Sequence, residues 1–368
     1  LDIEQMYIYD DLTDIVNAII SAYERGVTVR VILDDANNED SKATADLLTI
    51  NGITVKICTG TVPMYFDTQH NKGVIVDGTK VLISSINWSP TSFRENREAG
   101  LIIESVAVAA YYQELFDHDW SVCELYDSSV HLQTQSLILP ETIKNNQPSA
   151  SLAYINQFST VQTFEGEMIV TCMASPDNCY SVVANLLRNA RYTIYLSVYT
   201  LSSPYLIEIL RDRIANGVKV KLLLEKYQVS SYERDYNRDA LYRLTVQGVK
   251  SKENPSEKLK AEGLWASQDF TYQHCKYCII DNKTLILSSG NWARSSCPKP
   301  QDDGDVDGNR DWWIAIYGSN PGEIEETLPF SIPFLNLSSW FLIIGIVSAI
   351  MVIVSAKKIT WKRSMTIN

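Results

Sequence analysis

Two stretches of the sequence carry the same chemically active side chains at the same spacing. Both read His-x-Lys-x4-Asp, and their members are His70, Lys72 and Asp77 in the first copy and His274, Lys276 and Asp281 in the second. The chain holds four histidines in all, so two chance matches to this spacing are not expected. An imidazole can attack an electrophilic centre or move a proton, and an ammonium can hold an oxyanion. Each copy therefore has parts of a catalytic site.

The residues that follow each motif match as well. Each copy continues through a turn and an apolar strand into a Ser-Ser-x-Asn-Trp segment and then an acid, which adds the candidates Ser85, Asn87 and Glu98 in the first copy and Ser289, Asn291 and Asp311 in the second. Positions i and i+2 of a strand share a face, so each strand presents an imidazole beside an ammonium. Two such pairs brought face to face would surround a single tetrahedral anion.

The segments upstream of the motifs show that the whole chain is duplicated. Residues 26–33 match residues 217–224 at an offset of 191, and in both copies an amphipathic helix is expected just before this strand. A second helix and a strand at 53–58 follow in the first copy. Their counterparts are a helix at about 231–246, then Gly248 and a short strand. This alternation indicates α/β units around a mostly parallel or mixed sheet.

The second copy has an extra strand and helix at its start, expected at about 167–172 and 177–190. At the offset of the repeat, their counterparts in the first copy would precede Leu1. We therefore expect the chain to begin inside its first repeat. No export signal is visible, because neither a Met nor a charged and then apolar leader opens the sequence.

This duplicated pattern resembles the phospholipase D superfamily, whose repeated motif is His-x-Lys-x4-Asp followed by a Gly/Ser-Ser-x-Asn segment. The resemblance covers residues 1 to about 320, with both motifs complete. Ser84 and Ser288 stand where glycine is usual, and the downstream acid is Glu98 in one copy but Asp311 in the other. The resemblance implies an α/β fold of two tandem α/β/α sandwich halves, related by a pseudo-twofold axis, with one shared site at their interface.

The resemblance also implies a role for each candidate. One histidine forms a phosphohistidine and the other protonates the leaving alcohol, and family precedent favours His70 as nucleophile and His274 as acid. The phosphate would be bound by Lys72, Lys276, Asn87 and Asn291, with Ser85 and Ser289 close by. The imidazoles would be oriented by Glu98 and Asp311. The motif and the electric field of the site would be supported by Asp77 and Asp281. No metal or other cofactor is needed, and no obligate protein partner is implied.

The net charge of the chain favours a phospholipid over a nucleic acid as the substrate. The chain has 32 basic and 44 acidic residues, a net charge of −12, and residues 1–330 alone hold 28 basic and 44 acidic residues, a net charge of −16. A body this acidic disfavours non-specific binding of long polyanions. A phospholipid at a membrane is therefore the expected substrate, with its phosphatidyl group cleaved or transferred. Two alternatives stay open: a nuclease that acts on single-stranded nucleic acid with the same site, and a catalytically silent surface protein.

The C-terminal region predicts a membrane anchor. Residues 331–356 carry no charge, and about 20 apolar residues suffice to cross the hydrocarbon core, so a transmembrane helix is expected over 333–356. Four basic residues follow, which predicts a cytoplasmic tail and a catalytic part that is extracytoplasmic or lumenal. A buried core helix is the alternative. The expected segments are a first half (1–127), a linker (128–160), a second half (161–322), a juxtamembrane segment (323–332), the transmembrane helix (333–356) and a basic tail (357–368).

The cysteines and one acidic stretch are interpreted as structural. Seven cysteines permit disulfides in an exported protein, and their pairing is left open. Cys275 and Cys278 have CxxC spacing, but residues three apart in a strand point to opposite faces, so both are expected in the core. Asp117-His118-Asp119 is interpreted as the polar end of a helix rather than as a metal site.

Overall fold

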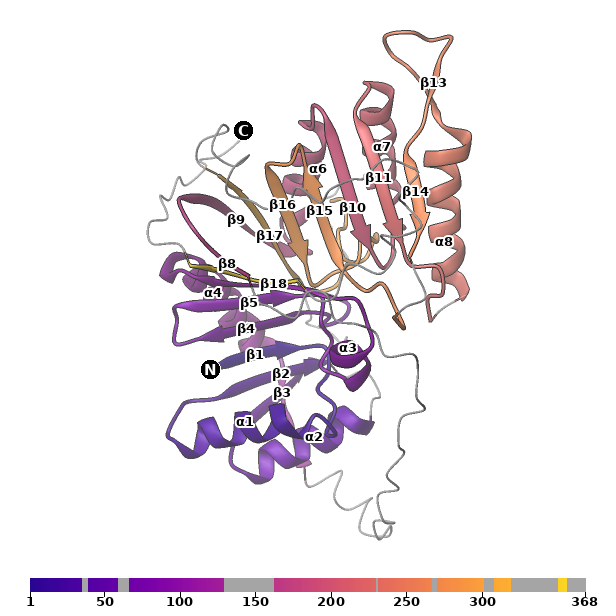
Figure 1. The fold of residues 1–368 in the computed structure, drawn as a ribbon. Helices are drawn as coiled ribbons and strands as arrows, with labels where there is room; N and C mark the ends of the chain where they lie inside the picture. Colours follow the sequence, from indigo (N-terminus) through magenta and orange to yellow (C-terminus); the bar gives the residue numbers. More distant parts are fainter. Residues whose placement is uncertain are drawn as a thin grey trace.

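Two β-sheets, one built mainly from each copy of the repeat, form the framework of the computed structural model (Figure 1). The structure describes residues 1–34, 39–58, 66–128, 162–229, 231–266, 270–300, 308–318 and 350–355. The elements of the first copy are β1 (Asp2–Gln5), α1 (Thr13–Glu24), β2 (Arg30–Asp34), α2 (Glu39–Ile50), β3 (Thr54–Cys58), β4 (Lys72–Val76), β5 (Lys80–Ser84), α3 (Pro90–Arg94), β6 (Ala99–Glu104), α4 (Val106–Val122) and β7 (Glu124–Leu125). The elements that follow are β8 (Gln162–Glu165), β9 (Met168–Ser175), α6 (Cys179–Arg188), β10 (Thr193–Val198), α7 (Pro204–Ala215), β11 (Lys219–Leu224), α8 (Ser231–Leu241), η1 (Tyr242–Gln247), β12 (Val249–Lys250), β13 (Lys258–Leu259), β14 (Glu262–Trp265), β15 (Lys276–Ile280), β16 (Thr284–Ser288), β17 (Asp311–Gly318) and β18 (Ile350–Ser355).

The two sheets share their strand order. The first runs β7-β3-β2-β1-β4-β5-β6-β18-β8 and the second β14-β11-β10-β15-β16-β17-β9. In each, one central strand pairs in parallel with the strand after the next helix and antiparallel with the motif strand: β1 pairs with β2 and β4, and β10 pairs with β11 and β15. The mixed sheets and the alternating helices confirm the α/β class that the repeat predicts.

Sequence signals mark the start of α7 and the ends of α1 and α7, the helices before β2 and β11. Ser203 accepts a hydrogen bond from the N–H of Leu206 (3.4 Å) at the start of α7, and Pro204 is the first residue of that helix. Gly26 and Gly217 follow α1 and α7 with φ angles of 89° and 83°, a left-handed conformation that suits glycine. Each glycine lets the chain turn back toward its sheet.

The two halves share an apolar core where they meet. Helices α1 and α2 cover the outer face of the first sheet, whereas α4 lies on the face turned toward the second half (Figure 1). There, Tyr112 and Phe116 of α4 belong to the same core as Trp312 and Ile314 of β17. Trp312 lies so close to Gly73 that a Cβ at this glycine would come within 2.4 Å of the indole ring. This packing fixes the motif strand β4 of the first half against β17 of the second half.

The cysteines divide into one disulfide and five thiols. Cys58 at the end of β3 is bonded to Cys123, the residue that follows α4. Cys275 and Cys278 are 2% and 0% exposed and belong to two different cores, the interface core and the core of the second half. The prediction that both are core residues is confirmed.

The region after α8 differs from expectation. The helix continues as the π-helical turn η1 and ends at Gly248, which has a φ of 63°. The short strand that follows, β12, pairs with β13 in a separate two-stranded sheet, and β14 is the strand that extends the main sheet beside β11. The prediction that the strand after Gly248 matches residues 53–58 is wrong, because the second copy inserts a hairpin before the equivalent strand.

The two sheets end differently beside β6 and β17. The strand expected at about 167–172 is β9, which pairs antiparallel with β17, and the helix expected at about 177–190 is α6. In the first sheet, β18 occupies the place beside β6 and pairs in parallel with both β6 and β8. The start of the predicted second half thus contributes β8 to the first sheet.

Residues 350–355 are therefore a strand where the sequence predicts the last turns of a transmembrane helix over 333–356. A run of Ile, Val and Met suits a strand as well as a membrane helix, and the edge of β6 offers it backbone hydrogen bonds. Among the described residues, no helix is both long and apolar enough to cross a bilayer. The rest of that expected helix, the juxtamembrane segment 323–332, the tail 357–368 and the linker beyond residue 128 lie outside the described residues.

Candidate active site

The motif histidines lie where the two halves meet. β4 and β15 each begin at the motif lysine, so each histidine lies two residues before its strand. The main-chain N–H of His70 donates to the carbonyl of Arg310 (3.0 Å), and that of His274 donates to the carbonyl of Arg97 (2.8 Å). Isolated β-bridges at the residue before each histidine reinforce this contact. Each histidine is thus held by the main chain of the other half.

Carboxylates that cross between the halves orient the imidazoles. Nδ1 of His70 lies 2.9 Å from Oδ1 of Asp311, and Nδ1 of His274 lies 2.8 Å from Oε1 of Glu98. Asp311 begins β17 in the second half, and Glu98 precedes β6 in the first. The contact expected between each acid and an imidazole is present, and each acid serves the histidine of the opposite half.

Both acids are held in the ionised form. Burial raises the pKa of Glu98, but the charge and hydrogen bond of His274 and the charge of Lys276 bring it below its ordinary value. Burial also raises the pKa of Asp311, and the neighbouring imidazole and ammonium again bring it below the ordinary value. An ionised carboxylate only accepts hydrogen bonds, so Nδ1 of each imidazole carries the proton. Nε2 then has its lone pair available for chemistry.

Each motif lysine lies against its own histidine. Nζ of Lys276 is 3.1 and 3.0 Å from the two ring nitrogens of His274, and Nζ of Lys72 is 3.3 and 3.4 Å from those of His70. Both ammonium groups also donate to the carbonyl of the histidine two residues earlier. Both lysines are completely buried. Their charge is therefore concentrated on the one site that the histidines line.

Burial changes the charge of this cluster. Burial lowers the pKa of Lys72 to about 7, with Asp311 opposing and Lys276 reinforcing this change. Burial and then the charge of Lys72 lower the pKa of His70. Burial is likewise the main cause that lowers the pKa of His274 to about 4, against the opposing charge of Glu98. Near neutral pH the imidazoles are neutral, as a nucleophile or proton acceptor must be.

The two serines bind the acids. Ser85 Oγ donates to Oε2 of Glu98 (2.5 Å) and accepts from the N–H of Ala99 (2.9 Å). Ser289 Oγ donates to Oδ1 of Asp311 (2.8 Å) and accepts from the N–H of Trp312 (3.0 Å). Both side chains are fully buried. The serines, expected close to the phosphate-binding groups, therefore position the carboxylates.

The two asparagines keep unsatisfied polar atoms. Asn87 and Asn291 follow the two serines and are half-buried. Oδ1 of each is buried without a hydrogen-bond partner among the described residues. A buried polar atom in this state costs free energy unless a ligand or water pairs with it. Both amide groups therefore suit contacts with a bound polar group.

The motif aspartates lie away from this site. Asp281 accepts hydrogen bonds from the main-chain N–H groups of Arg191 (2.8 Å), Tyr192 (2.7 Å) and Thr193 (2.8 Å), and so holds the start of β10. Asp281 and His274 lie beyond opposite ends of β15, a strand that is roughly 16 Å long at about 3.3 Å per residue. Asp77 is exposed at the equivalent turn, with a positive φ of 51° beside the 54° of Asp281. The prediction that both belong to the catalytic set is corrected, because they lie at turns on the far ends of the motif strands. The hydrogen bonds of Asp281 fit the role in supporting the motif that was also expected of it.

The remaining candidates converge from both halves. Two imidazoles, two ammonium groups and two amides can bind a tetrahedral anion and exchange a group on it through nitrogen. Within the described part of the chain, no group of three or more His, Cys, Asp or Glu side chains could hold a metal ion.

Comparison with known proteins identifies the family. A family model described as "Cardiolipin synthase, PLD-like domain" matches residues 1–120 and 183–319, which is most of both halves. The chain belongs to the phospholipase D superfamily. This agrees with the duplicated motif and with the paired sheets that present it.

Individual phospholipase D relatives match shorter stretches. The mitochondrial cardiolipin hydrolase of Xenopus tropicalis is 33% identical over 103 residues, which is 28% of this chain and 47% of that protein. The phospholipase D of Rickettsia prowazekii (strain Madrid E) is 29% identical over 117 residues, which is 32% of this chain and 53% of that protein. The chain spans about half the length of the curated relatives it matches.

One solved structure shares the two-halved fold over most of its length. The phosphatidylserine synthase of Haemophilus influenzae Rd KW20 aligns with a TM-score of 0.55 and 13% sequence identity, covering 88% of this chain and 78% of that chain. At this identity the likeness shows the fold alone. The alignment supports a shared fold that extends over both halves of the chain.

A second pair of acids was missed by the sequence analysis. Oδ1 of Asp34 accepts from the N–H of Gln69 (2.8 Å), and Oε2 of Glu225 accepts from the N–H of Gln273 (2.6 Å). Asp34 is the last residue of β2 and Glu225 is the residue after β11, and each acid fixes the residue directly before a motif histidine. Glu225 follows Asp34 at the 191-residue offset of the repeat, so an alignment of the copies beyond residue 33 could have found the pair.

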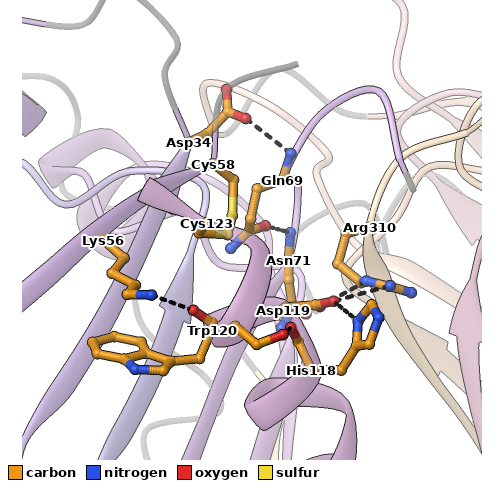
Figure 2. The surroundings of a disulfide bond; sticks show 11 residues. Asp34, Lys56, Cys58, Gln69, Asn71, His118, Asp119, Trp120, Cys123 and Arg310 are labelled. Carbon is orange, nitrogen blue, oxygen red and sulfur yellow. Dashed lines mark hydrogen bonds and ion pairs between the residues drawn. A yellow bond between two sulfur atoms is a disulfide. The ribbon is translucent and has the colours of Figure 1, made fainter. Parts of the chain in front are cut away.

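A buried arginine that joins the halves was missed as well. Arg310 is 1% exposed, and its Nη2 donates to Oδ1 of Asp119 (3.0 Å) from α4, while its Nη1 is paired with Asp177. The interpretation of Asp117-His118-Asp119 as a polar helix end is therefore wrong for Asp119, which is fully buried. Figure 2 shows this ion pair beside the disulfide, and the N–H of Cys123 donates to the carbonyl of Asp119 (3.0 Å). The disulfide thus anchors the turn of α4 that binds Arg310.

Proposed function

We propose that this chain is a phosphodiesterase that cleaves or transfers the phosphatidyl group of phospholipids through a phosphohistidine intermediate. The observation that carries the proposal is the crossed arrangement of His70 with Asp311 and of His274 with Glu98. Two oriented imidazoles that face one anion site can divide a displacement at phosphorus into two steps. A carboxylate on each Nδ1 leaves both Nε2 atoms directed to this chemistry.

The reaction follows from the roles of the two imidazoles. Nε2 of His70 attacks phosphorus and forms the P–N bond, the bond to the leaving alcohol breaks, and His274 gives that oxygen its proton. The neutral His274 then takes a proton from water or an acceptor alcohol, whose oxygen displaces the phosphoryl group from His70. The negative phosphodiester favours the protonated form of His274 when bound, against the burial that disfavours it. The motif lysines and asparagines hold the non-bridging oxygens.

Three observations favour a phospholipid over a nucleic acid. The relatives named above are a cardiolipin hydrolase and a phospholipase D, and the structural neighbour is a phosphatidylserine synthase. Residues 1–330 have 28 basic and 44 acidic residues, which disfavours capture of long polyanions. The phosphate-binding groups are instead few, buried and local to the site.

The test is turnover by the full chain, solubilised in detergent and kept in EDTA. Mixed phospholipid vesicles and a labelled single-stranded oligonucleotide are supplied in parallel, with His70→Ala and His274→Ala alongside wild type. We expect lipid cleavage that both substitutions abolish. Oligonucleotide cleavage with the same dependence would overturn the lipid proposal in favour of a nuclease. Folded protein with neither activity would overturn the proposal in favour of a silent surface protein.

We also propose that residues 333–356 attach the protein to a membrane, with the tail 357–368 in the cytoplasm and the catalytic part extracytoplasmic or lumenal. The uncharged run and the four basic residues after it support this location. Residues 350–355 cannot lie in a bilayer and pair with β6 at once, so the two states exclude each other. Resistance of the protein to carbonate extraction, with protease cleavage of the tail from the cytoplasmic side only, is the expected result. Release by carbonate would overturn the attachment.

A further inference from the structure

The pairs His70–Asp311 and His274–Glu98 make the site nearly symmetric, but the side chains that lie beside the two motifs differ. The N–H of Tyr199 donates to the carbonyl of Cys275 (3.1 Å), and in the first half the N–H of Met6 donates to the carbonyl of Asn71 (2.9 Å). Cys275 and Asn71 are the middle residues of the two His-x-Lys motifs, so Tyr199 and Met6 are structural equivalents. An aromatic ring therefore stands in one half where a thioether stands in the other.

The ring of Tyr199 contacts the second motif directly. Its centroid lies 4.8 Å from that of the His274 imidazole, with an interplanar angle of 67°. Nζ of Lys276 lies over the same ring, 5.8 Å from its centroid, and 3.0 Å from Nε2 of His274. Tyrosine, imidazole and ammonium thus form one contiguous cluster. The face of an aromatic ring carries negative charge density and stabilises a cation placed over it.

The position of the ring is fixed by the groups around it. The Tyr199 hydroxyl accepts from the N–H of Val229 (2.9 Å). The main-chain carbonyl of Tyr199 accepts from Nε2 of Gln228 (2.9 Å) and from Nδ2 of Asn237 (2.8 Å), and these two side chains are 1% and 0% exposed. The ring itself is 7% exposed. Held at both ends, it has little freedom to move away from His274.

We propose that Tyr199 is a positioning residue that makes the two histidines unequal, because its ring stabilises the protonated form of His274 and leaves His70 unaffected. The proposal deepens the proposed function, on which it rests, by giving a physical cause for His274 acting as the proton donor. The other groups do not produce this difference. His274 faces Glu98 from the start of β6, Lys276 on its own strand and Lys72 on β4. His70 faces the matching set, Asp311, Lys72 and Lys276, and no aromatic ring among the described residues is recorded against it.

The first test measures the histidines without turnover. NMR titration of the imidazole signals suits this chain, which has four histidines, and His→Gln variants assign them. Tyr199→Met places the residue of the first half in the second with a similar apolar volume, and Tyr199→Phe keeps the ring. We expect Tyr199→Met to lower the titration midpoint of His274 by about half to one pH unit and to leave that of His70 in place. Tyr199→Phe should retain the wild-type midpoint.

A reciprocal variant keeps the proposal testable if Tyr199→Met does not fold. Met6→Tyr should raise the titration midpoint of His70 and leave that of His274 in place. Equal shifts of both histidines, or an unchanged His274 midpoint in folded Tyr199→Met, would overturn the proposal. These results do not depend on turnover, so a wild-type chain without lipid cleavage would reject the proposed function and leave this inference to be judged by the titration. Where turnover is found, the alkaline limb of the kcat/KM profile should move to lower pH in Tyr199→Met and stay in Tyr199→Phe.

Discussion

His70 and Asp311 are 241 residues apart in the chain, yet Nδ1 of the first lies 2.9 Å from Oδ1 of the second. The first half provides the imidazole and the second half the carboxylate. His274 and Glu98 repeat the exchange in the opposite direction. Neither half holds both a motif histidine and the carboxylate that orients it. Docking of the two halves is therefore a condition for orienting either histidine.

Replacing the Asp311 carboxylate with an amide should remove most activity and retain the fold. In Asp311→Asn, Nδ1 of His70 faces a group that can donate or accept, so the imidazole loses its fixed tautomer. We expect kcat to fall roughly 10²- to 10⁴-fold with little change in KM. Asp281→Asn is the matched control, because Asp281 caps β10 away from the site. It should keep kcat and lower the melting temperature, and an equal loss of kcat in both variants would contradict the crossed arrangement.

The sequence predicts the reacting groups well because their spacing repeats. The motif histidines and lysines follow from spacing and residue type, the acids Glu98 and Asp311 follow from the matching Asn-Arg-acid segments, and the structure brings these groups together. The exchange of acids between halves could not be predicted, since it depends on how two sheets pack. For Asp281, the position inside the motif suggests a part in the chemistry, but the structure shows its carboxylate bound to three main-chain N–H groups.

The free energy of unfolding should depend on pH because the imidazole of His274 is buried. Its pKa in the folded chain is lowered to about 4, whereas an unfolded histidine titrates near 6.5. Between these values the unfolded chain binds more protons, so the free energy of unfolding falls as pH drops from about 6.5 toward 4. The loss amounts to about 3 kcal/mol at the low end. Urea unfolding at several pH values should show this fall, and a smaller fall in His274→Gln. A slope that does not change in His274→Gln would mean that the imidazole is not buried in its neutral form.

Removing the disulfide should weaken the site as well as the fold. Cys58 and Cys123 close a loop with a sequence separation of 65 residues, and the same turn of α4 presents Asp119 to Arg310. The double variant Cys58→Ala/Cys123→Ala should lose about 2–4 kcal/mol of unfolding free energy. We expect activity to fall at temperatures where the fold persists, because the carbonyl of Arg310 holds His70. Cys172→Ala, which removes a thiol outside any disulfide, should keep its activity under the same conditions.

The buried pair of Arg310 and Asp119 illustrates why part of the site is invisible in the sequence. Each residue looks like an ordinary surface charge beside a motif or at a helix end. Their burial is decided only when α4 of the first half packs against β17 of the second. Similarly, nothing in the apolar run 350–355 distinguishes a membrane helix from a strand, and the edge of β6 decides it in the structure. Contacts between distant segments are thus what residue type and period leave open.

Arg310→Met should be among the most destabilising single substitutions in the chain. It leaves Asp119 buried beside the fully buried Glu4, whose pKa is already raised by burial and then by Asp119. Removing one partner of a buried pair costs about 3–5 kcal/mol, whereas removing both can be nearly neutral. Arg310→Met/Asp119→Asn should therefore recover part of the stability that Arg310→Met loses in urea unfolding. Arg238→Met is the control, since Arg238 and Asp235 form a surface pair that is 67% and 72% exposed, and it should change stability by less than about 1 kcal/mol. If the double variant is no more stable than Arg310→Met, the ion pair is not what joins the halves at this point.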